Sequence, residues 1–187
     1  MPSVYSTTPF TAWGWLSVSE LKHSINMLRL PGRVFHESMP SAAIPTGTFT
    51  FILKSSHWVL FFNVCGNTFF FDPTCRTSSR KYSSLPAVNI PARVQPPGSI
   101  LCGNYCLLVA HILRCHWGEI QTYIPNVALV KMKSVIGRYL FISPQECGPN
   151  EMLAQYFTAD HQLGEEWQYN KFRQYDSHLS RVALSKL

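Results

Sequence analysis

Two cysteines lie four residues apart at the front of an apolar segment, SILCGNYCLLVAHIL, at residues 99–113. A cysteine attacks as its thiolate, so a catalytic cysteine needs a lowered pKa and partial exposure. Cys102 stands at the expected start of a helix, where unpaired N–H groups and the helix dipole favour an anion, and Gly103 leaves room beside it. Cys106 lies one turn deeper, where a cysteine packs as a small hydrophobe. The pattern predicts Cys102 as the nucleophile and Cys106 as a core residue.

A nucleophilic cysteine also needs a base, and the base needs an orienting group. His57 opens one predicted strand and Asp72 closes the next one, with a turn expected near Gly66 between them. Folding this hairpin brings Asp72 near the position opposite His57. We therefore expect a hydrogen bond between the two side chains that holds the imidazole for proton transfer.

Acyl transfer needs hydrogen-bond donors for its oxyanion. The first backbone N–H groups of the Cys102 helix can supply one donor, and the side-chain amide of Gln95, seven residues earlier, can supply another. Each residue taken singly has an ordinary structural explanation, as a half-buried histidine, an Asp-Pro strand end or a solvated glutamine before a turn. Their order along the chain is what indicates a site.

The helices and strands around these residues have recognisable sequence patterns. Apolar residues recur at helical spacing over residues 15–30, where Ser17 or Ser19 can cap a first amphipathic helix. Three segments rich in aromatic and branched residues predict short antiparallel strands. These strands are expected at residues 48–54, 57–63 and 68–72.

A polar, basic and proline-rich segment at residues 76–98 follows the strands and is expected to form a surface connection. It is long for a structureless loop in a compact domain, which indicates a function or a short hidden element. Residues 103–114 are apolar on nearly every face, as in a central buried helix.

The rest of the chain is expected to complete an α+β domain. Residues 118–141 mix apolar positions with proline and glycine and give no secure helical phase, whereas residues 150–163 and 165–187 predict two closing amphipathic helices. We therefore expect a small antiparallel or mixed sheet packed with helices around the central helix, with residues 1–187 forming one domain.

The composition favours a folded, basic protein. Hydrophobic residues make up 46% of the 187 residues and charged residues only 14%, which argues against disorder, and the net charge of +6 fits a polyanion such as DNA.

The apolar stretches are shorter than the roughly 20 residues of a membrane span, and the first ten residues lack a signal-peptide pattern. Six cysteines are too sparse for a secreted disulfide scaffold. We expect reduced thiols and an intracellular protein with no membrane partner.

A His-Trp pair on a strand, an acid ending the next strand, and Gln-x6-Cys-Gly leading into a buried helix resemble the adenovirus maturation proteases, the adenain family. They are also similar to the wider group of SUMO-deconjugating cysteine proteases. HWVLFFNVCGNTFFFDP resembles the family segment that carries the base and the acid. QPPGSILCGNYCLLVAHIL resembles the segment that carries the oxyanion glutamine, the nucleophile and the central helix. The similarity covers residues 50–115, and the first helix extends it.

The resemblance implies a role for each matching residue. Cys102 becomes the nucleophile, His57 the general base and Asp72 its orienting partner, while Gln95 forms the oxyanion hole with the Cys102 backbone N–H. It further implies an α+β fold with papain-like active-site geometry, in which the order His, Asp, Cys reverses that of the papain-like enzymes. Adenovirus proteases commonly have Glu where Asp72 stands and the SUMO-directed relatives have Asp, and either carboxylate can serve.

The adenovirus enzymes are activated by viral DNA and by a capsid-derived peptide that forms a disulfide upstream of the nucleophile. In this chain no cysteine stands between Arg76 and Leu101, and Cys75 does not match the position of the family cysteine that forms this disulfide. We therefore do not expect a disulfide-linked peptide here. Activation by DNA or by a peptide stays open. Two basic groups are candidate DNA contacts, although charged runs more often form solvated faces. The first comprises Arg76, Arg80, Lys81 and Arg93, and the second comprises Lys131, Lys133 and Arg138.

Three other interpretations compete with a protease. The cysteines and histidines Cys102, Cys106, His111, Cys115 and His116 could suggest zinc, but His111 lies off the helix face of the two first cysteines and no C-x2-C pair occurs. An inactive DNA-binding domain on the same fold would not need the full His, Asp, Gln and Cys set. An isopeptidase acting on ubiquitin-like modifiers would share the mechanism and differ in its substrate.

The sequence therefore predicts a viral cysteine endopeptidase that cleaves capsid or core precursor proteins during virion maturation. We expect protein or peptide substrates, no metal, no required cofactor, a monomer, and a location in the host nucleus and the virion. The last three residues, Ser185, Lys186 and Leu187, either match a peroxisomal address or end an amphipathic tail.

Overall fold

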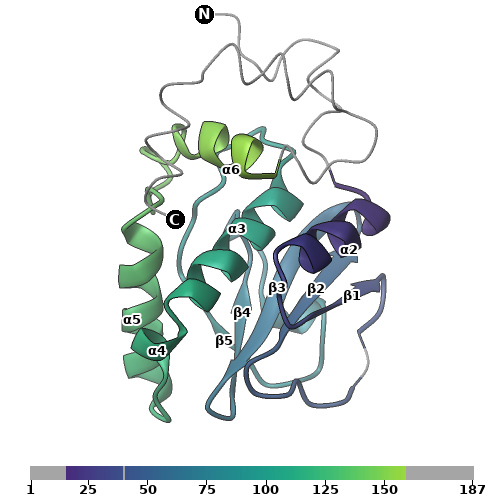
Figure 1. Ribbon diagram of the computed structural model, residues 1–187, viewed down its shortest axis with the longest axis vertical. Coiled ribbons are helices and arrows are strands. Elements are labelled where there is room, and N and C mark those ends of the chain that lie inside the picture. The colour runs from purple at the N-terminus through teal and green to yellow at the C-terminus, as the bar shows by residue number, and fades with distance from the viewer. Residues whose placement is uncertain (1–15, 40, 159–187) are drawn as a thin grey trace, which may run out of the picture.

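The computed structural model describes residues 16–39 and 41–158. Within them the chain has an α+β fold built on one five-stranded mixed sheet (Figure 1). The helices are α2 (Val18–Met27), α3 (Cys102–Cys115), α4 (Trp117–Ile120), α5 (Pro125–Gly137) and α6 (Asn150–Thr158). The strands, in their order across the sheet, are β1 (Gly32–His36), β2 (Phe49–Lys54), β3 (His57–Val64), β4 (Asn67–Phe71) and β5 (Val88–Asn89), and η1 (Ser79–Lys81) is a 3-10 helix.

The three predicted antiparallel strands are confirmed as β2, β3 and β4. Two-residue turns connect them, and the central residues of both turns have positive φ, as type I′ turns require. These residues are Ser55 and Ser56 in the first turn and Cys65 and Gly66 in the second. Because β3 and β4 are antiparallel neighbours, the start of β3 and the end of β4 lie at the same end of the sheet.

The two outer strands were not expected from the sequence. β1 pairs with β2 in parallel, and β5 pairs with β4 in parallel, which makes the sheet mixed. β5 has two residues and lies in the proline-rich connection, where the length of that segment indicated a short hidden element. β1 has partly exposed residues without regular alternation, so it carries no strand pattern of its own.

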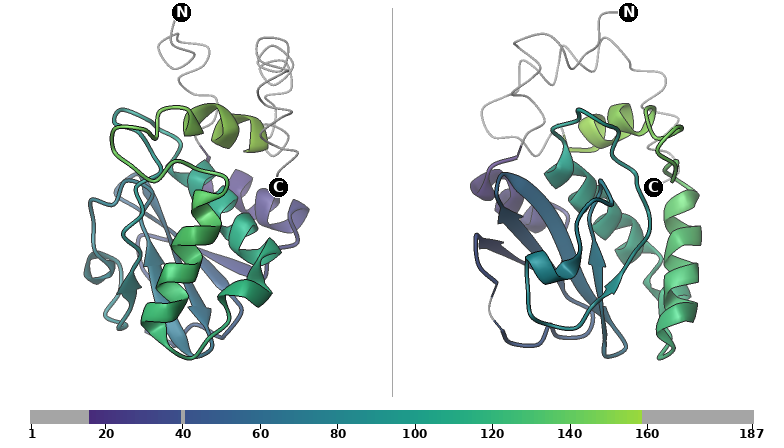
Figure 2. Two further views of the ribbon diagram at one scale, coloured as in Figure 1. Left: turned by 90° about the vertical axis from the view of Figure 1, so that its left-hand side faces the viewer. Right: turned by 180° about the vertical axis from the view of Figure 1, so that it is seen from behind.

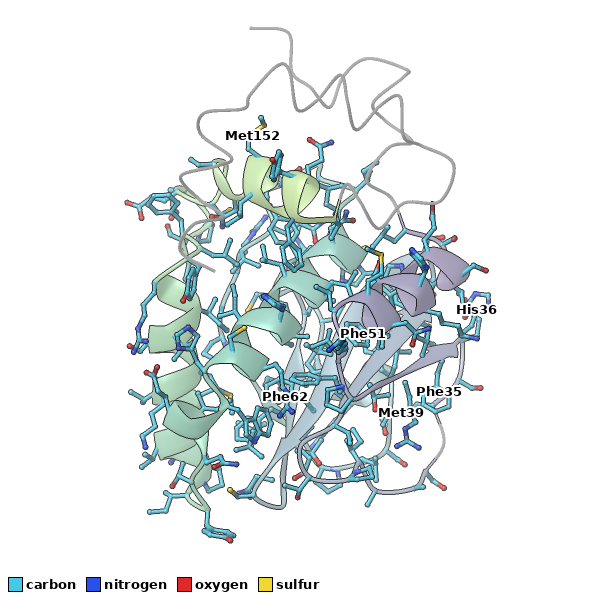
Figure 3. The ribbon with its side chains drawn as sticks, in the orientation of Figure 1. Phe35, His36, Met39, Phe51, Phe62 and Met152 are labelled. Atoms are coloured by element: carbon cyan, nitrogen blue, oxygen red, sulfur yellow. The ribbon has the colours of Figure 1, made fainter. Side chains whose placement is uncertain are left out.

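The sheet separates two cores because alternate side chains of a strand point to opposite faces. The larger core lies beneath α2 and α3 and includes Phe51 and Phe62, which Figure 3 shows between the sheet and these helices. The smaller core contains Val59, Phe61 and Tyr82. The segment that carries η1 crosses this second face of the sheet (Figure 2, right).

Helix α3 is the predicted central helix, and every residue from Cys102 to Ala110 is buried. It lies on β3 and also contacts α2, α5 and α6, so apolar side chains are needed on all of its faces (Figure 1). The tight enclosure of this helix is what gives Cys102 a defined place relative to the sheet.

The remaining helix predictions have mixed outcomes. Ser17 is the N-cap of α2, where its Oγ accepts from Glu20 N–H at 3.2 Å and Glu20 accepts from Ser17 N–H at 2.8 Å. The segment without a secure phase contains α5, and α6 confirms the first part of the closing helix. The second closing helix and the last three residues lie outside the described residues. No helix in the described part of the chain is long and apolar enough to cross a bilayer.

Candidate active site

Cys102 is the first residue of α3 and lies beside the start of β3. Its Sγ accepts a hydrogen bond from the backbone N–H of Trp58 at 3.3 Å. The N-cap residue, Leu101, offers no side-chain acceptor to the helix, so the backbone N–H groups of the first turn act on the region of the thiol. Cys102 is 4% exposed, which is less than the partial exposure we expected, because the thiol lies where α3 meets the buried Trp58.

Gly103 allows α3 to approach β3 closely. A Cβ at this position would lie 2.8 Å from Cδ1 and 3.2 Å from Nε1 of Trp58. The Trp58 indole is fully buried and donates from Nε1 to the carbonyl of Leu16 at 2.9 Å, so it cannot easily move away. The glycine therefore makes room for the tryptophan that lies next to the nucleophile.

His57 and Asp72 meet as the hairpin pattern predicted. His57 is the first residue of β3, and Asp72 directly follows β4. Nε2 of His57 lies 2.8 Å from Oδ1 of Asp72. The Asp72 side chain is 2% exposed and the His57 side chain 22% exposed, so the imidazole is the more accessible member of the pair. Since Nε2 is engaged by Asp72, Nδ1 is the nitrogen left for the thiol.

The His57 and Asp72 side chains change each other's titration. Burial lowers the pKa of His57, but hydrogen bonds to Asp72 and Cys102 and the negative charge of both outweigh burial and raise the pKa to about 9. Burial raises the pKa of Asp72, but hydrogen bonds from His57, Thr77 and Thr74 outweigh it and hold the pKa well below its ordinary value. At neutral pH the pair is therefore an imidazolium beside a carboxylate.

A loop that sequence reasoning missed wraps around the Asp72 carboxylate. Oδ1 accepts from the backbone N–H of Thr74 at 2.9 Å and from its hydroxyl at 2.8 Å. Oδ2 accepts from the N–H groups of Arg76 and Thr77 at 3.2 and 2.9 Å and from the Thr77 hydroxyl at 2.6 Å. These donors compensate the burial of the charge. An Asp followed by Pro and Thr is typical of such turns and could have indicated the loop.

Gln95 is 2% exposed, which rules out the solvated role that a glutamine before a Pro-Pro-Gly turn usually has. Its backbone N–H donates to the carbonyl of Pro73 at 3.0 Å, directly after Asp72. Its Nε2 donates to the carbonyl of Ser99 at 2.9 Å, three residues before Cys102. Oε1 of Gln95 is buried without a hydrogen-bond partner. The structure thus ties Gln95 to both segments that carry the site.

The first basic group does not form one cluster around the thiol. Arg76, Arg80 and Lys81 are exposed, and Arg93 is half-buried, with its Nε donating to the carbonyl of Gln95 at 3.4 Å. Arg80 also lines a pocket of about 590 Å³ beside η1.

The second basic group contains one residue that already has a partner. Arg138 forms a two-bond ion pair with Glu119 at 3.1 and 2.6 Å. Lys131 is exposed and Lys133 half-buried on α5.

The cysteines and histidines of α3 do not gather as metal ligands. Cys106 is fully buried, and burial raises its pKa well above the ordinary value, which confirms it as a packing residue. At the far end of the helix Cys115 Sγ lies 3.6 Å from His111 Nε2, while His116 bonds Glu119. Within residues 16–39 and 41–158 there is no group of three or more His, Cys, Asp or Glu that could hold a metal.

Neither a scan against models of known protein families nor a search of curated proteins returns a match to this chain.

Proposed function

We propose that this protein is a cysteine endopeptidase with Cys102 as nucleophile. The observation that carries the proposal is that the His57–Asp72 hydrogen bond of 2.8 Å lies next to Cys102, whose Sγ accepts at 3.3 Å from the backbone N–H of Trp58, the residue after His57, at the start of a buried helix. A thiol, an imidazole and an orienting carboxylate in this arrangement are the parts that nucleophilic acyl transfer needs. The arrangement also supports the papain-like active-site geometry that the sequence resemblance implies.

The site residues divide the proposed reaction among them. The Cys102 thiolate attacks the peptide carbonyl carbon and forms a tetrahedral intermediate, whose oxyanion is bound by the Cys102 backbone N–H and the Gln95 amide. His57 then gives its proton to the leaving amine as the C–N bond breaks, which leaves a thioester. Water then attacks the thioester carbonyl while neutral His57 takes a proton from the water, the C–S bond breaks, and the acid product leaves Cys102 as a thiolate beside protonated His57.

The charge on His57 supports this sequence of steps. Because the pKa of His57 is about 9, the ring carries a proton at neutral pH and has it available for the leaving group. The positive ring also stabilises a thiolate beside it. Gln95 Nε2 uses one of its two N–H groups for Ser99, and the other is the donor we assign to the oxyanion.

The sequence resemblance to adenovirus maturation proteases supports a viral enzyme that cleaves capsid or core precursors in the host nucleus and the virion. We also propose DNA as an activator, because Arg76, Arg80 and Lys81 are exposed in the segment after Asp72 and can bind phosphate groups. Protein or peptide substrates follow from the chemistry of the site.

A peptide-library digest with matched variants tests the proposal. Cys102→Ser and His57→Ala should each abolish cleavage while the circular dichroism spectrum persists, and Cys115→Ser, which removes an exposed thiol at the other end of α3, should leave cleavage unchanged. Iodoacetamide at low pH should label Cys102 selectively, and His57→Ala should abolish that selectivity. Cleavage retained in either active-site variant would refute the assignment. Cleavage of ubiquitin-like conjugates but not of peptides would redirect it to an isopeptidase.

A further inference from the structure

The first residue of α6 lies close to the backbone of Gln95. Asn150 is 3% exposed, and its Nδ2 donates to the carbonyl of Val94 at 2.9 Å and to the carbonyl of Phe141 at 2.8 Å. Its Oδ1 accepts from the backbone N–H of Phe141 at 2.9 Å. The side-chain amide thus uses both of its N–H groups and its oxygen in a buried site.

These bonds hold the peptide group that precedes Gln95 from two sides. Asn150 binds the carbonyl oxygen of Val94, and the N–H of Gln95, in the same peptide group, donates to the Pro73 carbonyl at 3.0 Å. Pro73 follows Asp72 directly, so the orientation of Gln95 is set relative to the base and acid pair. Because the peptide group is planar, hydrogen bonds at both its oxygen and its nitrogen restrain its rotation.

Helix α6 is in turn anchored on the first turn of the nucleophile helix. The Tyr105 hydroxyl donates to Oε1 of Glu151 at 2.6 Å, and the Asn104 amide bonds the Thr158 hydroxyl. Figure 1 shows α6 lying across the end of α3 at which Cys102 stands, and Figure 2 shows the same arrangement from the side. One short helix therefore contacts both the Gln95 segment and the start of α3.

We propose that Asn150 is a positioning residue that sets Gln95 as the oxyanion donor relative to Cys102, an inference that rests on the proposed endopeptidase function. Asn150 lies 56 positions beyond Val94 in the chain and touches neither Cys102 nor His57 through any bond described above. It acts on the site through the Val94–Gln95 peptide group, while its two bonds to Phe141 connect α6 to the segment that follows α5. Its loss lets the Gln95 amide leave the place where the oxyanion forms, while the thiol and imidazole stay in contact.

Two reactions of Cys102 separate this role from a general structural one. Peptide hydrolysis passes through an oxyanion, whereas alkylation by iodoacetamide is a displacement at carbon that needs only the activated thiolate. Asn150→Ala should lower kcat for peptide hydrolysis by about 10- to 100-fold, the cost expected of a displaced catalytic group, and leave the alkylation rate of Cys102 within about twofold. In a Gln95→Ala background the same change should lower kcat no further.

Asn126→Ala, at an exposed asparagine of α5, is the matched control and should change neither rate. If Asn150→Ala does not fold, Asn150→Asp carries the same test, since it keeps the size and the acceptor for Phe141 N–H and removes the donors to the carbonyls of Val94 and Phe141. Unchanged kcat in the Asn150 variant, an equal loss of alkylation, or a loss that persists in the Gln95→Ala background would overturn the inference and leave the endopeptidase assignment standing. A wild-type protein without Cys102-dependent hydrolysis would overturn both.

Discussion

The proton on His57 decides what the candidate site can do at neutral pH. The raised pKa of His57, about 9 against an ordinary 6.5, makes the imidazolium the resting form of the ring. The same shift links stability to pH, because the charged ring has partners only in the folded state. This contribution is fully present below pH 6.5 and is lost as the pH rises through about 9.

The pH profile of hydrolysis should follow this proton. We expect kcat/KM to fall as the pH rises through about 9, because neutral His57 no longer protonates the leaving amine. Asp72→Asn should move this fall to lower pH, since it removes a charge and a hydrogen bond that raise the pKa of His57. A pH–rate profile of both proteins measures the shift. Coincident profiles would show that Asp72 does not control the charge of His57.

Alkylation of Cys102 by iodoacetamide serves as the control for that profile. Because alkylation needs the thiolate and no proton donor, its rate should not fall over the range in which hydrolysis does. A parallel fall in both rates would point to unfolding at high pH and not to the loss of one proton.

At the scale of elements, the site depends on how closely α3 approaches β3. Trp58 of β3 is the contact point, since it donates to Cys102 from its backbone and faces Gly103 with its ring. On the other side of the site, the loop after β4 surrounds Asp72 with hydrogen-bond donors. A helix and a loop therefore position the two ends of the catalytic group, and His57 lies between them.

Gly103→Ala tests the helix contact. The added Cβ would lie 2.8 Å from Trp58 Cδ1, and both elements are buried, so overpacking should cost about 1–3 kcal/mol of unfolding free energy. Alkylation of Cys102 should also slow as α3 shifts. Gly118→Ala, where no atom lies within 4 Å of the new Cβ, is the matched control and should leave stability unchanged or slightly higher. Urea denaturation measures the stability of both variants. Equal midpoints for Gly103→Ala and wild type would contradict the predicted overpacking against Trp58.

At the scale of the whole molecule, the excess of positive charge is the feature that favours a polyanionic partner. The basic residues differ in their surroundings. The Arg138 guanidinium forms an ion pair with Glu119, whereas Arg80 and Lys81 are exposed on η1. The ion pair raises the pKa of Arg138 and lowers the pKa of Glu119 to about 2, so both groups stay charged at neutral pH.

If DNA binds through the connection after Asp72, Arg80→Ala should weaken DNA binding and reduce the salt dependence of the affinity by about one counterion. Arg138→Ala, which removes an already paired charge, should have the smaller effect. Fluorescence anisotropy with labelled duplex DNA at several salt concentrations measures both variants. A larger loss for Arg138→Ala would place the contact at the C-terminal end of α5.

Local patterns carried most of the prediction. Strand composition, the turn expected near Gly66 and the apolar helix identified β2, β3, β4 and α3, and with them the meeting of His57 and Asp72. The outer strands β1 and β5 were not predicted from the sequence, because short strands at the edges of a sheet have no periodicity of their own. The loop around Asp72 was missed although Asp-Pro-Thr is typical of such turns, because three of its donors are backbone N–H groups whose direction is set by the folded loop.

The sequence alone therefore predicts β2, β3, β4 and α3 and contains the order His57, Asp72 and Cys102. These features depend on residues that are close together in the chain. The burial of Gln95 and its connection to Asn150 were decided only by the tertiary structure. Asn150 and the Val94 carbonyl are 56 residues apart, and a hydrogen bond of that kind forms only when packing of α6 on α3 brings the two groups together and excludes the water that would otherwise pair with each.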